Sequence, residues 1–322
     1  MGQVQRGPPM PSLTAAGRCG IIRAMTSTSP QRAPAALFML GAVALFAAMD
    51  AGLKSLSAHY PPLQVGAIRG LASFPLVLVW ALSTASLRSL VRVHWPMHLL
   101  RGGLSVLMMA CFVYGVARLP LTTAYAITFA APLLVTALAG PVLGEHVGPR
   151  RWAAVGIGLL GVLVVLRPTG AGMMTAAGGA VLVAACCYAA SFLTTRLLAR
   201  RDSTQAMVLW MVLLLGVAAG LLAWPSWVPL QSAHGLQIGI VGMAGAGAQV
   251  LLTEAFRRGE ASMIAPLEYS ALLWGVLLDV ALWGVLPDGI TWIGAAIIVG
   301  SGLYVLYRER VAARAAAATP PP

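Results

Sequence analysis

The sequence predicts an all-α polytopic membrane protein with ten transmembrane helices in two inverted five-helix repeats. Of its 322 residues, 59% are hydrophobic and only 9% are charged, whereas soluble domains average about 25% charged residues. Apolar runs of about 20 residues recur along the whole chain, and each is long enough to cross about 30 Å of hydrocarbon. Basic residues gather between alternate runs, as they do at the cytosolic side of membrane proteins.

The ten predicted spans cover residues 34–54, 63–83, 99–117, 122–142, 152–167, 176–197, 205–224, 236–256, 262–285 and 290–307. Their connections are short, so consecutive helices should pack as antiparallel neighbours. Residues 1–33 are basic and lack the apolar stretch of a signal peptide; translation could begin at Met1 or at Met25. We expect this segment and residues 311–322 to be disordered cytosolic tails.

The basic residues set the orientation of the spans. With both termini in the cytosol, 17 of the 21 Lys and Arg residues lie inside, Arg101 at the start of the third span among them. Lys54, Arg118 and Arg167 lie outside, and Arg69 falls within the second span. This excess fits the positive-inside rule and predicts a multi-pass protein of the cytoplasmic membrane.

Several other functions are not favoured by the composition. The net charge of +12 follows from the basic residues that flank the spans, so we expect no nucleic-acid partner. The cysteines show neither a disulfide framework nor metal-ligand spacing, and all five histidines fall in loops or at span ends. Gly-x-Ser-x-Gly and HExxH motifs are absent from the sequence. We therefore expect no enzyme activity, cofactor or metal; an intramembrane enzyme or a sensor is the alternative class.

The two halves of the chain show a weak internal repeat. Residues 119–166 align with residues 259–306 at an offset of 140, with nine identities in 48 positions, and Trp152 then matches Trp292. So few identities in so apolar a sequence are close to chance. The topology supports the repeat more strongly, because two units of five helices must have opposite orientations. Inverted repeats place a substrate site near the midplane between the halves.

Four segments carry a resemblance to a known family: "YPPLQVGAIRG" (60–70), "LPLTTAYAITFAAPLLVTALAGPVLGE" (119–145), "MIAPLEYSALLWGVLLDVALWG" (263–284) and "IGAAIIVGSGLYVLYRE" (293–309). Over about residues 34–310 the chain resembles a ten-helix EamA-type member of the drug/metabolite transporter superfamily. The resemblance implies a first EamA repeat at 34–167 and a second at 168–310.

The same resemblance implies a permease that carries a small metabolite, an amino acid or related compound, more often as an exporter. Some relatives instead import compounds such as S-adenosylmethionine or riboflavin. One departure concerns Glu145, which ends the "LGE" of the first repeat. The second repeat has "WGVLPD" (283–288) there, so no role is carried over to that position.

Two carboxylates in the ninth span are the leading site candidates. Glu268 and Asp279 are 11 residues apart, so in a continuous α-helix they share one face about 16 Å apart. Ionisable groups within membrane helices commonly line a water-filled cavity, where they bind a cation or take up a proton. Alternatively, each is held by an Arg or by backbone groups and serves packing.

The first two spans add Asp50, Lys54 and Arg69. Asp50 and Lys54 are four residues apart on one helix, which favours an ion pair between them. All three residues are expected toward the outer half of the membrane. They form either a structural ion cluster or an outer gate or anion site for the substrate.

Uncharged polar residues complete the candidate set. Pro132 frees the carbonyl of Thr128, which a substrate, a water or a neighbouring hydroxyl could then satisfy. The other candidates for substrate binding or coupling are Tyr114, Tyr125, Tyr188, Gln249 and Tyr269. Such groups also serve as contacts between membrane helices. Together the residues predict a secondary transporter that works by alternating access as a monomer or homodimer, with proton coupling as one option.

Overall fold

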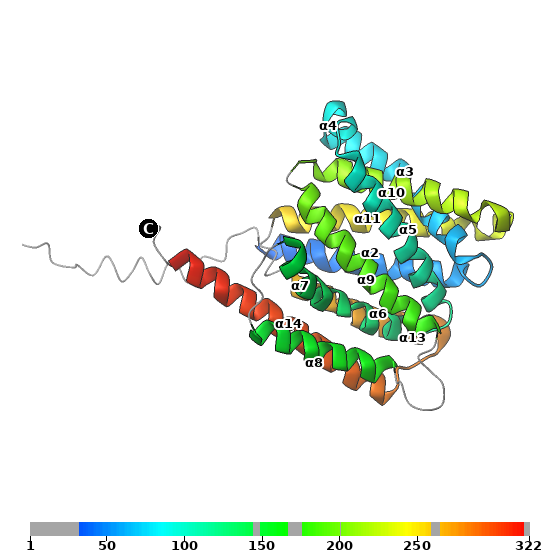
Figure 1. Cartoon of the computed structure of the whole chain (residues 1–322). Helices are drawn as coiled ribbons and strands as arrows, with labels where there is room; N and C mark the ends of the chain where they lie inside the picture. Colours follow the sequence, from blue (N-terminus) through cyan, green and yellow to red (C-terminus); the bar gives the residue numbers. More distant parts are fainter. Residues whose placement is uncertain (1–31, 144–148, 167–175, 200, 259–264, 319–322) are drawn as a thin grey trace, which may run out of the picture.

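The computed structural model describes residues 32–143, 149–166, 176–199, 201–258 and 265–318 (Figure 1). The α-helices are α2 (Arg32–Leu56), α3 (Pro62–Thr84), α4 (Leu87–Val91), α5 (Trp95–Val116), α6 (Leu121–Thr128), α7 (Ala130–Leu143), α8 (Pro149–Leu166), α9 (Ala176–Leu198), α10 (Thr204–Ala223), α11 (Gly235–Arg258), α13 (Ala271–Trp283) and α14 (Gly289–Ala318). Three short 3-10 helices are η1 (Trp224–Ser226), η2 (Ser232–His234) and η3 (Ala265–Ser270). These residues contain no β-strand, so the all-α prediction is confirmed.

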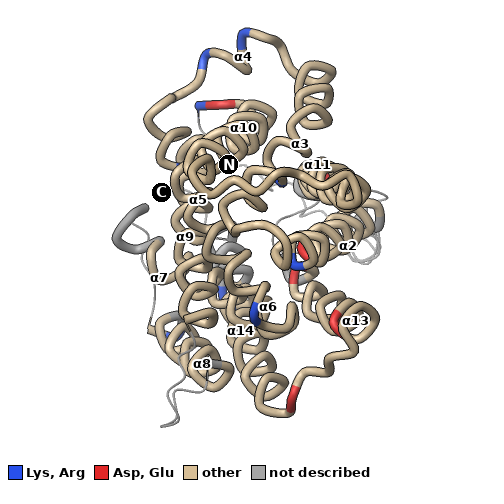
Figure 2. Tube along the Cα trace, turned by 90° about the vertical axis from the view of Figure 1, so that its right-hand side faces the viewer, with Lys and Arg blue, Asp and Glu red and all other residues tan. Residues whose placement is uncertain are grey.

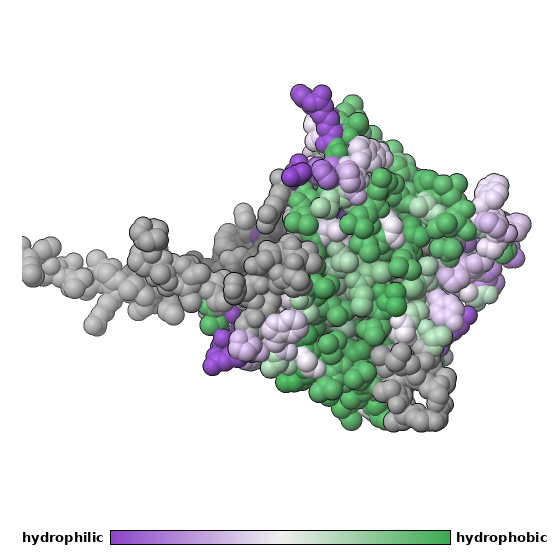
Figure 3. All heavy atoms as spheres, viewed as in Figure 1, coloured by the Kyte–Doolittle hydropathy of each residue, from purple (hydrophilic) through white to green (hydrophobic). Residues whose placement is uncertain are grey.

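The surface has the polarity expected of a membrane protein. Apolar atoms form a broad band across the middle of the visible face, and polar atoms lie at the two ends of the helices (Figure 3). Large apolar side chains such as Leu221 and Leu273 are about 70% and 69% exposed on this bundle, as expected where helices face lipid rather than water. Charged residues are sparse along the helices (Figure 2).

Within the described residues, eight helices are long and apolar enough to cross a membrane. The fifth and ninth expected spans are shorter in the structure, because α8 carries an apolar stretch of only Trp152–Val165 and α13 has 13 residues. The chain is therefore a polytopic all-α membrane protein. We call the end of the bundle where α2 begins and α14 finishes the terminal end, and the opposite end the far end.

The packing of the helices is symmetric between the two halves. Helix α2 packs on α11, and α5 packs on α9; α3 packs on α10, α6 on α13, and α8 on α14. If each helical segment of the first half is exchanged for its counterpart in the second half, the α2–α11 pair becomes the α9–α5 pair, and the reverse. The other three pairs, α3–α10, α6–α13 and α8–α14, are unchanged by the exchange. This is the pattern of two repeats related by a pseudo-two-fold axis, and it confirms the two-repeat architecture.

Glycine allows α3 and α10 to approach closely. A Cβ atom added at Gly70 of α3 would lie 2.5 Å from the Cα atom of Gly216 on α10. The two helices therefore meet backbone to backbone, as small residues permit in membrane proteins.

Two expected spans, 122–142 and 262–285, are not continuous helices. The fourth is divided into α6 and α7 at Phe129, whose φ of −67° and ψ of −3° leave the regular helix. Pro132 follows in the first turn of α7, where a missing N–H and the ring favour such a break. The ninth is divided into η3 and α13. The short helix α4 was not expected, and α14 continues to Ala318, beyond residue 310.

Candidate functional site

The two broken helices meet at the centre of the bundle. Helix α6 packs against α13, and the ring of Phe129 lies 4.9 Å from the ring of Tyr269 between centroids. These two residues are equivalent under the offset of 140. Breaks at corresponding positions of two inverted repeats are a common location for the substrate site of a transporter. The region around the breaks is therefore the candidate site.

Glu268 lies in η3, at the break of the ninth segment. Its side chain is partly exposed, and within the described residues it makes neither a hydrogen bond nor an ion pair. The hydroxyl groups of Tyr188 on α9 and Tyr269 lie within electrostatic range of its carboxylate. The Tyr269 hydroxyl is buried and has no hydrogen-bond partner in this part of the chain. Polar groups therefore gather here without satisfying one another.

Arg101 is a charged residue of the same region that the sequence analysis counted among the inside residues at the start of the third span. The structure buries its side chain: Arg101 is the seventh residue of α5 and only 8% exposed. One guanidinium N–H donates to the carbonyl of Met207 at 2.9 Å, and Nε has no partner among the described residues. Tyr188 lies within electrostatic range of the guanidinium. Trp95 and Pro96 at the start of α5 are the signals that could have placed Arg101 inside the helix.

A second polar group lies around Asp50 of α2. The Tyr125 hydroxyl on α6 donates to Asp50 at 2.9 Å, and Arg69 of α3 lies within electrostatic range of the same carboxylate. The Nε of Arg69 donates to the sulfur of Met49 at 3.2 Å. Asp50, Tyr125 and Arg69 thus connect three helices of the first repeat.

Gln249 lies with Arg69 rather than with Glu268. Together with Ser73, these two residues line a small recess between α3, α10 and α11. The hydroxyl of Ser73 is buried without a hydrogen-bond partner in the described residues.

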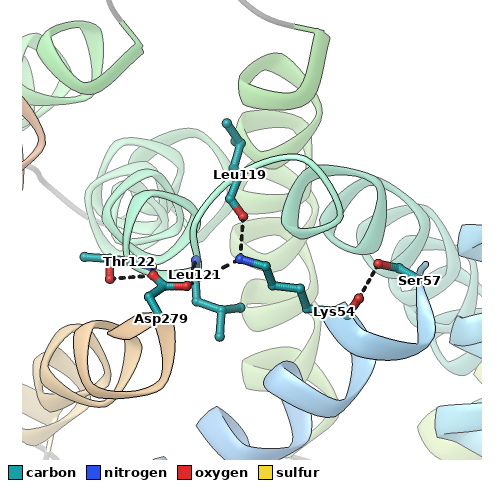
Figure 4. Close-up of polar contacts among 6 residues, drawn as sticks. All are labelled: Lys54, Ser57, Leu119, Leu121, Thr122 and Asp279. Atoms are coloured by element: carbon teal, nitrogen blue, oxygen red, sulfur yellow. Dashed lines mark hydrogen bonds and ion pairs between the residues drawn. The ribbon is translucent and has the colours of Figure 1, made fainter. Parts of the chain in front are cut away.

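The far end holds a third polar group, drawn in Figure 4. Asp279 of α13 is fully buried and accepts hydrogen bonds from the backbone N–H groups of Leu121 and Thr122 at 2.9 and 2.8 Å. The Thr122 hydroxyl donates to it at 2.8 Å. The carboxylate therefore satisfies the first N–H groups of α6, where the helix dipole favours negative charge. We call Asp279, Lys54, Leu121 and Thr122 the far-end cluster.

Lys54 completes the far-end cluster from α2. Its Nζ lies 3.4 Å from Asp279 and donates to the carbonyl of Leu119 at 3.0 Å. The ammonium also lies 4.4 Å from the ring centroid of Trp283. The expected ion pair between Asp50 and Lys54 is therefore wrong. The long Lys54 side chain reaches a buried carboxylate on another helix instead.

Glu268 and Asp279 consequently have different environments. The argument that put them on one face assumed a continuous α-helix, but Glu268 lies in a 3-10 segment and Asp279 in α13. A 3-10 helix has three residues per turn and a rise of about 2.0 Å, so the helical phase is not preserved across the break. Asp279 has a full set of protein partners, whereas Glu268 has none in the described residues.

Three further candidates do not join these groups through their side chains. The Thr128 hydroxyl donates to the carbonyl of Ala124 in its own helix at 2.9 Å. Pro132 belongs to the break between α6 and α7. Tyr114 lies toward the far end of α5, where the Arg118 guanidinium is 3.7 Å from its ring centroid. No group of three potential metal ligands occurs among the described residues.

A comparison with protein families identifies the chain. The model of the EamA-like transporter family matches residues 33–167 and 176–307. The chain belongs to the EamA-like transporter family. The family resemblance read from the sequence motifs is therefore confirmed, and the two matched stretches are the two repeats.

Three curated relatives are membrane transporters by name. A riboflavin transporter of Rhizobium johnstonii is 31% identical over 221 residues, 68% of this chain and 73% of the relative. An S-adenosylmethionine uptake transporter of Rickettsia prowazekii is 26% identical over 213 residues, 66% and 72% of the two chains. A pseudopaline exporter of Pseudomonas aeruginosa is 26% identical over 258 residues, 79% and 89%. These names indicate transporters rather than enzymes.

One solved crystal structure has the same fold. It superposes with a TM-score of 0.61 and 22% sequence identity, and it covers 87% of this chain and 99% of the other.

Proposed function

We propose that this EamA-like protein is a secondary transporter that exports a small metabolite, an amino acid or related compound, across the cytoplasmic membrane by alternating access. The proposal rests on one observation above all. A carboxylate, Glu268, lies at the break of the ninth segment without a partner in the described residues. Because a carboxylate without a partner is costly inside a membrane span, Glu268 is best explained as a ligand for a cationic group or a proton during the cycle.

The far-end cluster gives this proposal a structural basis for alternating access. Lys54 and the start of α6 belong to the first repeat, and Asp279 belongs to the second. These contacts tie the two repeats together at one end, so they have to separate before that end can open. In the proposed topology both termini are cytosolic and the far end faces outward, which makes the cluster the outer gate.

Uptake is the second candidate direction. The S-adenosylmethionine uptake transporter among the relatives favours it. Transport measured in membrane vesicles of the two orientations separates the candidates, since an exporter loads inside-out vesicles when the substrate is added outside.

The test compares Glu268→Gln with Glu254→Gln. Glu254 is a matched control because it lies toward the terminal end of α11, where Arg258 binds it at 2.9 Å. Metabolites that differ between cells with and without the wild-type protein identify the substrate, and its transport is then measured in proteoliposomes. We expect Glu268→Gln to lower transport at least about tenfold, a change of about 1.4 kcal/mol in the limiting step. We expect Glu254→Gln to transport like the wild type, and both variants to fold normally. Full transport by Glu268→Gln with an unchanged pH dependence would remove Glu268 from the proposed mechanism.

A further inference from the structure

Arg101 is buried at a high cost that its contacts within the described residues do not offset. A guanidinium carries five N–H donors and stays charged. Only the bond to the Met207 carbonyl is made within the described residues, and Nε is buried without a partner. Removing such a charge from water is costly unless further hydrogen bonds or an opposite charge satisfy it. A helix anchor alone would not need a charge, because an amide could donate the same single bond.

Tyr188 is the residue that Arg101 and Glu268 have in common. It lies within electrostatic range of both the guanidinium and the carboxylate. Its side chain is 40% exposed although it belongs to the central part of α9. A tyrosine with exposed surface in range of two opposite charges is expected to line a water-accessible space rather than to face hydrocarbon. The three side chains come from α5, α9 and η3, which belong to both repeats.

We propose that Arg101 binds an anionic group of the transported molecule, and that Glu268 binds a cationic group of the same molecule. This inference rests on the proposed function and adds the substrate class, a zwitterion with a carboxylate or phosphate at one end. The anion would complete the missing hydrogen bonds of Arg101, since a guanidinium fork matches both carboxylate and phosphate. An uncharged molecule such as riboflavin would leave both charges unpaired. A molecule with an amino-acid group would satisfy them.

The experiment measures the electrostatic field of the site at position 188. In a background where the four cysteines (Cys19, Cys111, Cys186 and Cys187) are replaced by alanine, Tyr188→Cys introduces a single thiol. The purified protein in detergent is labelled with an anionic sulfonatoethyl or a cationic trimethylammonioethyl methanethiosulfonate. The ratio of the two labelling rates reports the charge near the thiol without any transport step.

Arg101→Gln removes one positive charge near the introduced thiol. Because that charge attracts the anionic reagent and repels the cationic one, we expect the anionic-to-cationic rate ratio to fall about tenfold. Arg101→Lys should preserve the ratio, and Glu268→Gln should raise it. Arg101→Lys also covers the case in which the glutamine variant does not fold. A ratio that stays the same in Arg101→Gln, or an introduced thiol at position 188 that does not react, would overturn the inference.

A second arm identifies the anion. Sodium chloride is replaced at constant ionic strength by acetate or by phosphate, and labelling by the anionic reagent is followed. Slower labelling in acetate indicates a carboxylate site, and slower labelling in phosphate indicates a phosphate site; Arg101→Gln should abolish either effect. Protection by neither anion counts against the inference. Because labelling needs no transport, this result can fail while the Glu268→Gln transport test succeeds, and the reverse also holds.

Discussion

The far-end cluster permits a quantitative prediction for Asp279→Asn. The wild-type carboxylate accepts hydrogen bonds from two backbone N–H groups of α6, from the Thr122 hydroxyl and from Lys54. The amide keeps the volume of the side chain. However, it has one acceptor oxygen instead of two, it adds two donors, and it carries no charge. The Lys54 ammonium then retains only the Leu119 carbonyl as a hydrogen-bond acceptor in Figure 4.

The expected loss follows from these contacts. Breaking a buried ion pair from one side costs about 3–5 kcal/mol. Lys54 is 13% exposed at its side chain and so is less completely buried than Asp279, and we therefore expect about 3 kcal/mol. In a protein of this size that corresponds to a fall in the melting temperature of about 5–10 °C. Lys54→Met should cost less, about 1–2 kcal/mol, because Asp279 then keeps its bonds from α6.

The assay is thermal unfolding of the purified variants in one detergent. Asp288→Asn is a matched control, since Asp288 accepts hydrogen bonds from Thr291 at the start of α14. Asparagine is nearly as good as aspartate at a helix N-cap, so this variant should melt within about 1–2 °C of the wild type. If Asp279→Asn melts as close to the wild type as the control does, the cluster does not stabilise the fold in the way argued.

Two further predictions concern other contacts of the helices. Gly70→Ala should lower the free energy of unfolding by about 1–3 kcal/mol, because the added Cβ would meet the backbone of Gly216. Gly103→Ala, which has no heavy atom within 4 Å of the new Cβ, should instead be neutral or stabilising by up to about 1 kcal/mol; equal effects of the two would contradict the close contact. Tyr125→Phe removes the bond to Asp50 and should lower thermal stability by about 1–3 kcal/mol, whereas an unchanged melting curve would show that this bond contributes nothing.

The sequence was sufficient for the architecture because its causes are local. The length of an apolar run depends on composition alone, and each expected span corresponds to a helix or to a pair of helical pieces. The inverted repeat could be predicted from the sequence equally well, since two units of five spans must have opposite orientations. The offset of 140 even matched Phe129 with Tyr269, whose rings meet in the structure.

The polar contacts could not be predicted in the same way, because the choice of partner is tertiary. The spacing of Asp50 and Lys54 favours an ion pair on an isolated helix, but such pairs contribute only about 0.2–0.5 kcal/mol. Asp279 lies fully buried at the start of α6, and leaving its carboxylate without Lys54 would cost more free energy than the helical ion pair contributes. Lys54 therefore forms its ion pair with Asp279, and the Tyr125 hydroxyl donates a hydrogen bond to Asp50. Nothing in the spacing within one helix could reveal these choices.

Arg101 shows that burial could not be judged from the spacing of charged residues alone. Counting charges between spans grouped it with the inside residues, yet α5 begins at Trp95, so Arg101 lies in its second turn. The charged residues within the membrane differ in whether protein groups satisfy their hydrogen-bonding and ion-pairing needs. The far-end cluster satisfies Lys54 and Asp279 with protein groups. Arg101 and Glu268 keep unsatisfied groups within the described residues, with opposite signs and Tyr188 in range of both. If they met directly they would form a salt bridge and need no ligand. As unpaired groups within the described residues they fit the proposed recognition of a molecule that brings both charges, whereas the far-end cluster fits a role in stability.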